Sequence, residues 1–203
     1  SDDMPHRYSR LWDDGDIKNL ALMTDAVHEH GALAACELYY GSTVTSNRMT
    51  REMPLSPSGL PNLSTTGARH FPLQTRAMDK ADIKAWVGWQ RDAAMRAKAA
   101  GFDIIYVYSG MGFGPYQFLS PRTNQRSDEY GGPMTNRVRL LREMIEVTRQ
   151  SEAKLQISHF IFVGRHTWPT AGRALDKVDA ARREGLDVMI DAFPYTCGNT
   201  TCN

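Results

Sequence analysis

The sequence contains few cysteines, no long apolar run and almost no net charge. Its 203 residues include three cysteines, and 24 basic residues against 23 acidic residues give a formal charge of +1. This balance offers no electrostatic footprint for nucleic acid or for an anionic membrane. Apolar runs such as residues 32–36 are far below the roughly 20 residues that a membrane span needs, and the polar N-terminus lacks a signal-peptide core. We therefore expect a cytoplasmic protein that binds neither nucleic acid nor a membrane.

Two catalytic motifs are also missing, and the cysteines do not form a framework. There is no G-x-S-x-G elbow of a serine hydrolase, and GMGFG at residues 110–114 lacks the Lys-Ser/Thr of a P-loop. Cys36 lies in an apolar run and is expected to be a small buried hydrophobe. Cys197 and Cys202 could form a disulfide, a metal pair or two free thiols, and we favour free thiols because nothing else indicates secretion.

Helical and strand-like segments alternate four times along the chain. Helices are expected where apolar residues recur at helical spacing, and strands where short runs are apolar, β-branched or aromatic. The expected helices span residues 16–31, 81–101, 134–149 and 171–185, and the expected strands span residues 32–41, 102–110, 154–160 and 186–193. Residues 42–76 are predicted to form a long loop. The alternation predicts an α/β fold with four parallel βα units, half of a (β/α)8 barrel, in a single domain over residues 1–203.

Half a barrel leaves two open sheet edges and an apolar inner face. Two identical chains related by a two-fold axis can pair these edges and close eight strands. We therefore expect an obligate homodimer, or a larger assembly of such dimers. In that arrangement Asp191 of one chain lies beside Glu37 of the other.

The segment NQRSDEYGGPMTNR at residues 124–137 resembles the signature of the Old Yellow Enzyme family of flavin barrels. With LWDDGDIKNL, ELYYG, GFDIIYVY and QFLSP, residues 1–150 are most similar to the trimethylamine and dimethylamine dehydrogenase branch. This resemblance implies the third and fourth βα units of a flavin barrel, with Glu37 facing the flavin pyrimidine ring and Tyr108 retained. Met111 stands where the branch has a substrate-side histidine, and the late strands that grip the FMN phosphate are missing. Bound FMN is therefore not expected.

A second resemblance begins near residue 154. LQISHF, VGRHTWP, ALDKVDAARREGLDV and DAFPYTCGNTT resemble the D-aminoacylase (N-acyl-D-amino-acid deacylase) branch of the amidohydrolases. It implies that His159 is the metal-binding histidine of the fifth strand, while Phe193 replaces a second ligand. We interpret the chain as a fusion of a flavin-barrel fragment, residues 1–150, with an amidohydrolase fragment, residues 151–203.

Strand alternation places candidate site residues on the inner face of the barrel, near the C-terminal ends of the strands. The inward set is Glu37, Tyr106, Tyr108, His159 and Asp191, above Ala35, Ile104, Ile157 and Met189. Imidazole and carboxylate together are a suitable ligand set for a divalent ion. We therefore predict a metal site, with zinc favoured, formed by His159, Asp191 and Glu37. The alternative is a buried His159 that is hydrogen-bonded to Asp191 without a metal.

The predicted activity is a metal-dependent hydrolase of broad specificity that attacks an ester, amide or phosphoester of a small molecule with a metal-activated water. Tyr108 and His166 are candidates to stabilise the oxyanion or to shuttle a proton. Aromatic residues beside the site could form an apolar pocket or fill the core: Tyr39, Tyr40, Tyr106, Tyr108, Phe113 and Tyr116. The alternatives are a flavin-binding oxidoreductase remnant and a folded chimera without evolved activity.

Overall fold

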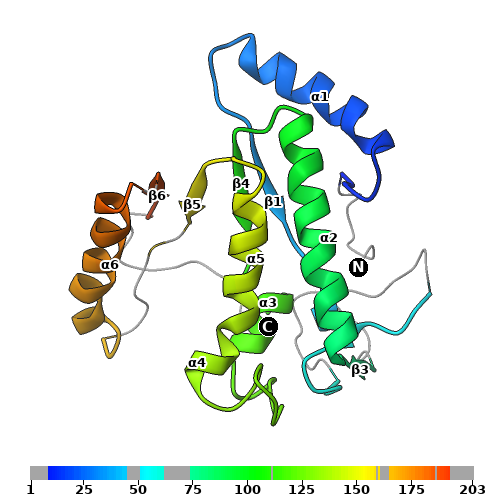
Figure 1. Cartoon of the computed structure of the whole chain (residues 1–203), viewed down its shortest axis with the longest axis vertical. Coiled ribbons are helices and arrows are strands. Elements are labelled where there is room, and N and C mark those ends of the chain that lie inside the picture. The colour runs from blue at the N-terminus through cyan, green and yellow to red at the C-terminus, as the bar shows by residue number, and fades with distance from the viewer. Residues whose placement is uncertain are drawn as a thin grey trace.

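A computed structural model describes residues 9–44, 51–61, 74–110, 112–158, 160, 165–185 and 187–192 of the chain. Helices alternate with parallel strands, and α2 and α5 lie side by side in front of β1 and β4 (Figure 1). The helices are α1 (Gly15–His28), α2 (Lys80–Ala99), α3 (Gly114–Leu119), α4 (Met134–Arg137), α5 (Arg139–Arg149) and α6 (Ala171–Arg183), with short 3-10 turns at Ser42–Val44 and Trp168–Thr170. The strands are β1 (Ala35–Leu38), β2 (Leu55–Ser56), β3 (Arg76–Ala77), β4 (Ile104–Val107), β5 (Leu155–Ile157) and β6 (Val188–Ile190).

Local sequence explains where the main helices begin and end. The side chain of Asp79 accepts a hydrogen bond from the Asp82 N–H at 2.8 Å, and the Asp82 side chain accepts one from the Asp79 N–H at 2.8 Å, which completes a capping box at the start of α2. At the other end Gly101 has a φ of +89°, a conformation that glycine adopts without strain. The chain can therefore turn sharply from α2 into β4.

The four main strands are parallel and follow the order β1, β4, β5, β6. β1 pairs with β4 so that Glu37 is opposite Tyr106, and β5 pairs with β6 so that Gln156 is opposite Met189. A single bridge between Ile104 and Lys154 connects the two pairs. It consists of hydrogen bonds from the Lys154 N–H to the Asp103 carbonyl at 3.1 Å and from the Ile105 N–H to the Lys154 carbonyl at 3.4 Å.

Helices cover one face of this sheet. Ile105 is fully buried in a first cluster against α1 and α2, and Cys36 and Leu38 pack against it from β1. A second cluster joins α2, α3 and α5 through Trp86, Phe118, Leu140 and other buried side chains. Because side chains alternate along a strand, the residues between these on β1 and β4 face the opposite side, which we call the inner face. Among the residues described, no helix has both the length and the apolar character needed to cross a membrane.

The α/β alternation expected from the sequence is confirmed, with differences in detail. The segment expected to be a loop, 42–76, contains β2 and starts β3, and these two-residue strands pair in parallel. The helix expected over 134–149 is broken at Val138, which separates α4 from α5. Helix α3 was not expected from the sequence.

Candidate active site

The inner face of β1 and β4 carries an exposed carboxylate beside tyrosines. Glu37 is exposed and lies opposite Tyr106 in the parallel ladder. Tyr108 directly follows β4, where its N–H donates to the Leu38 carbonyl at 3.2 Å. The predicted inward direction of Glu37 and Tyr106 agrees with this register, because their neighbours Cys36 and Ile105 pack against helices.

A polar cluster occupies the same face at the end of β5 and β6. The Asp191 carboxylate accepts hydrogen bonds from the Gln156 side-chain amide and from the Ser158 hydroxyl, the latter at 2.7 Å. Bridge partners in a parallel sheet point to the same side, so the pairing of Lys154 with Ile104 places Lys154, Gln156 and Ser158 on the inner face.

The predicted alternation on β5 is therefore wrong by one residue. Ile157 was expected beneath the site with Met189, but Ile157 is opposite Ile190, and Met189 is opposite Gln156. Met189 and Asp191 thus share a face with Gln156 and Ser158. Gln156 and Ser158 were missed, although the alternation of polar and apolar residues in KLQIS was a signal for them.

An aromatic cluster lies where β1 and β4 end. The ring of Phe113 makes edge-to-face contacts with Tyr39, at a centroid distance of 5.4 Å, and with Tyr108, at 5.3 Å. Tyr40 instead packs on Trp86 at 4.7 Å, and burial raises its pKa to about 12. Tyr116 is exposed. The predicted aromatic group is therefore divided between the end of the sheet, the core and the surface.

The predicted metal site is not assembled within the chain. β1 and β6 are separated by two strands, so Glu37 and Asp191 lie about 14 Å apart at the usual strand spacing. This separation is too large for both carboxylates of one chain to bind one ion, and the pairing expected between two chains stays a prediction. Among the residues described, no group of three or more His, Cys, Asp or Glu side chains could hold a metal.

The other candidate residues are exposed, packed on the helix side of the sheet or outside the described residues. His166 is exposed in the turn that precedes the second 3-10 segment. His159, Met111 and Phe193, and the cysteine pair Cys197 and Cys202, lie outside the described residues. Cys36 is a free thiol on the helix side of β1, and burial, with a smaller contribution from the charge of Glu37, raises its pKa to about 11.

The NQRSDEYGG segment forms a loop that is fixed by its own side chains. Arg126 donates to both carboxylate oxygens of Asp128, and also to the carbonyls of Pro57 (2.9 Å) and Met78. These hydrogen bonds from Arg126 lower the pKa of the Asp128 carboxyl. The side-chain amide of Asn124 donates to the carbonyls of Phe118 and Tyr130, each at 2.7 Å.

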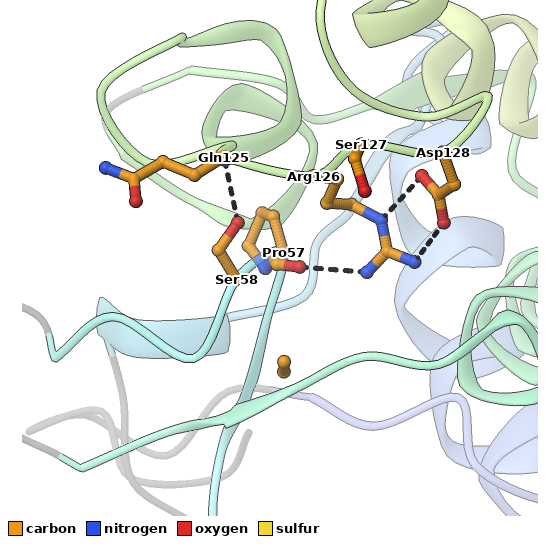
Figure 2. Close-up of a pocket in the computed structure, with 7 residues that line it drawn as sticks. Pro57, Ser58, Gln125, Arg126, Ser127 and Asp128 are labelled. Atoms are coloured by element: carbon orange, nitrogen blue, oxygen red, sulfur yellow. Dashed lines mark hydrogen bonds and ion pairs between the residues drawn. The ribbon is translucent and has the colours of Figure 1, made fainter.

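Gly131 is required in this loop for steric reasons. A Cβ at this position would lie 2.0 Å from the Arg126 carbonyl oxygen, closer than any side chain permits. Beside the loop is an open hollow of about 300 Å³, shown in Figure 2, which Pro57, Ser58, Ala77 and the segment 125–128 line. The Arg126 guanidinium is occupied by protein acceptors there, and Ser58 accepts from the Gln125 N–H at 2.8 Å. We therefore assign this motif a structural role.

Comparison with known proteins identifies the family. Residues 2–167 match the NADH:flavin oxidoreductase / NADH oxidase family. The chain belongs to this flavin oxidoreductase family. The resemblance of the N-terminal segment to flavin barrels is thereby confirmed.

Three relatives illustrate the similarity to this flavin oxidoreductase family. The dimethylamine dehydrogenase of Hyphomicrobium sp. (strain x) is 38% identical over 152 residues, which are 74% of this chain and 20% of that enzyme. The NADPH dehydrogenase of Bacillus licheniformis is 37% identical over 140 residues, 69% of this chain and 39% of that enzyme. The structure of histamine dehydrogenase from Rhizobium sp. 4-9 superimposes with a TM-score of 0.74 at 36% identity, covering 95% of this chain and 28% of that one. The chain thus spans between a fifth and two fifths of the length of the two enzymes compared by sequence.

These findings correct the functional prediction. The prediction of a zinc-dependent hydrolase is wrong, because residues 2–167 match a family of NADH:flavin oxidoreductases and the two sequence relatives are named as dehydrogenases. The expectation that FMN is not bound is contradicted in the same way. The family match continues to residue 167, past the fusion point expected near residues 150–153, and gives no support to a separate D-aminoacylase parent.

Proposed function

We propose that this chain forms the ring-facing part of an FMN-dependent oxidoreductase. The observation that carries this proposal is the exposed Glu37 carboxylate beside Tyr106 on the inner face, at the strand ends where barrel enzymes bind their ligands. When bound, FMN supplies a two-electron acceptor that takes a hydride equivalent from one substrate and passes it to another. Family membership supports this reading.

The described residues suit two of the three parts of FMN. Glu37 can accept a hydrogen bond from the N3–H of the flavin pyrimidine ring. The Gln156, Ser158 and Asp191 cluster offers both donors and acceptors to the hydroxyls of the ribityl chain. A phosphate group requires backbone N–H groups or cations. The cation on the inner face of the described strands is Lys154, but it lies at the N-terminal end of β5, away from the ligand end, and pairs with Asp187 at 3.8 Å. The phosphate anchor must therefore come from elsewhere.

We further propose that the substrate is an amine. Two of the relatives are named for dimethylamine and histamine, which are cationic at neutral pH. An ammonium group is attracted by a carboxylate such as that of Glu37 and by the faces of the Tyr39 and Phe113 rings. In this proposal the Tyr108 hydroxyl holds or moves a proton at the substrate nitrogen. His166, exposed in its turn, has no assigned part.

Closure of the barrel is a separate proposal. Four strands do not enclose a site, and β1 and β6 are the edges of the described order. We propose that a second copy of the chain provides the missing wall, as the open edges predict. A D-aminoacylase origin for residues 154–203 is a proposal about descent that rests on the sequence resemblance alone, and the family match through residue 167 does not support it.

FMN titration tests the main proposal. We expect the intact chain to quench FMN fluorescence on binding and to show the visible absorption band of bound flavin. Glu37→Ala should weaken binding about tenfold, the usual loss for a hydrogen bond to a charged acceptor. Glu29→Ala is the matched control, because Glu29 lies at the exposed C-cap of α1.

Three outcomes decide between the proposals. A folded chain that leaves FMN fluorescence unchanged at millimolar protein would refute the FMN proposal. Equal affinities for the Glu37 and Glu29 variants would remove Glu37 from the site. A monomeric mass in the FMN-bound state, measured by light scattering after gel filtration, would refute closure by a second copy and leave flavin binding intact.

A further inference from the structure

The Asp191 carboxylate is held in one position on the inner face. It accepts hydrogen bonds from the Gln156 amide and from the Ser158 hydroxyl at 2.7 Å. Its own backbone is also fixed, because the Asp191 carbonyl accepts from the Phe160 N–H at 2.7 Å and the Asp191 N–H donates to Ile157 at 3.2 Å. The side chain is therefore a fixed negative charge at the end of β6.

The charges on this face are arranged unevenly from end to end. Glu37 and Asp191 lie toward the C-terminal ends of their strands, on the side where barrel ligands bind. Lys154, the cation that the register places on this face, lies at the N-terminal start of β5 and pairs with Asp187 at 3.8 Å. Within the described strands, the ligand end of the inner face is thus negative.

Such a charge affects the two redox states of a flavin differently. The oxidised ring is neutral, and it takes up two electrons with one proton to become an anion, or with two protons to stay neutral. A nearby carboxylate raises the free energy of the anion and leaves the neutral ring almost unchanged. The effect therefore appears as a lower reduction potential and as weaker binding of reduced FMN than of oxidised FMN.

We propose that Asp191 disfavours the anionic reduced state of FMN and so lowers the reduction potential of the flavin bound on this face. The proposal rests on the FMN-binding function proposed above. It makes Asp191 a residue that acts through its charge, and it assigns Gln156 and Ser158 the role of holding that charge in place. A flavin tuned in this way passes its electrons on readily once a substrate has reduced it.

The test compares FMN affinities in both redox states. FMN is titrated into the intact chain under anaerobic conditions, once oxidised and once reduced by dithionite, and the ratio of the two dissociation constants (reduced over oxidised) is measured. Asp191→Asn should lower this ratio about twofold to thirtyfold, the range for one unit charge at about 8 Å and an effective dielectric constant of about 20–80. Asp176→Asn is the matched control, since Asp176 is exposed on helix α6 and not on the sheet, and it should leave the ratio unchanged.

A second variant guards against misfolding of the first. Met189→Lys introduces a positive charge on the same face, opposite Gln156, and should also lower the ratio. Normal FMN binding with the wild-type ratio in both Asp191→Asn and Met189→Lys would overturn the inference. Failure of the wild-type chain to bind FMN in either state would instead overturn the proposed function, so the two failures are distinguishable.

Discussion

Replacing Arg126 by Met should destabilise the fold strongly, because the side chain is nearly buried and four of its five N–H groups donate to protein acceptors. It is 10% exposed, binds both oxygens of Asp128, and donates to the carbonyls of Pro57 and Met78. Removing one partner of a buried ion pair costs about 3–5 kcal/mol, because the other charge and its neighbouring acceptors lose their donors. Asp128 is 24% exposed and regains some hydration, which places the expected loss toward the lower end of that range.

Arg76 provides the matched control. It also binds both oxygens of an aspartate, Asp82, at 2.8 and 2.9 Å, but its side chain is 51% exposed. Exposed ion pairs contribute less than about 1 kcal/mol, so Arg76→Met should change stability little. Arg126→Lys separates charge from geometry: it keeps the charge but loses the fork that reaches several acceptors, and it should give an intermediate loss.

Urea unfolding followed by tryptophan fluorescence and far-UV circular dichroism measures these differences. A loss of about 3 kcal/mol moves the midpoint by more than about 1 M at typical slopes for small proteins. If Arg126→Met and Arg76→Met unfold at the same urea concentration, the structural role assigned to the NQRSDEYGG loop is wrong.

Three further predictions follow from individual groups. Gly131→Ala should cost about 1–3 kcal/mol of stability or prevent folding, because its Cβ would lie 2.0 Å from a carbonyl oxygen. In the control Gly88→Ala the new Cβ meets nothing within 4 Å, so this variant should be neutral or stabilising, and equal unfolding midpoints of the two variants would contradict the prediction. The Asp103 carboxyl has a lowered pKa, mainly through its hydrogen bond with His28, so its contribution to the free energy of unfolding is present above the unfolded pKa of about 3.9 and is lost as the pH falls through the folded pKa. Asp103→Asn should therefore flatten the dependence of stability on pH below about pH 4, and an unchanged dependence would count against the contact. With its pKa at about 11, Cys36 should react slowly with thiol reagents at pH 8 in a variant whose other two cysteines are serine, and labelling as fast as in urea would show that the thiol is not buried.

Periodicity predicted the main elements because it is a local property. The helical spacing in 81–101 and the apolar run around Ile105 are visible in the sequence and correspond to α2 and β4. β2 and β3 carry no such pattern. They pair because the Arg76 N–H reaches the Pro54 carbonyl at 2.9 Å, a contact that the packing of the loop determines.

The inner face was predictable on one half of the sheet and not on the other. On β1 and β4, Glu37 and Tyr106 alternate with buried residues, so their direction follows from burial. On β5 the direction depends on which residue bridges Ile104, and a shift of one residue turns every side chain to the other face. The function was mispredicted for a different reason: the similarity around His159 covers a short segment, whereas the flavin-barrel similarity covers most of the chain.

The bridge at Lys154 also divides the molecule into parts of unequal protection. Two backbone hydrogen bonds connect β4 to β5, and the two buried clusters of the described residues take no member from β5, α6 or β6. The last strand–helix–strand unit can therefore open while α2 and β4 remain folded, and its amide protons should exchange with solvent first. The Asp191 carboxylate belongs to that unit, so it stays on the inner face only while the two hydrogen bonds between β4 and β5 are intact.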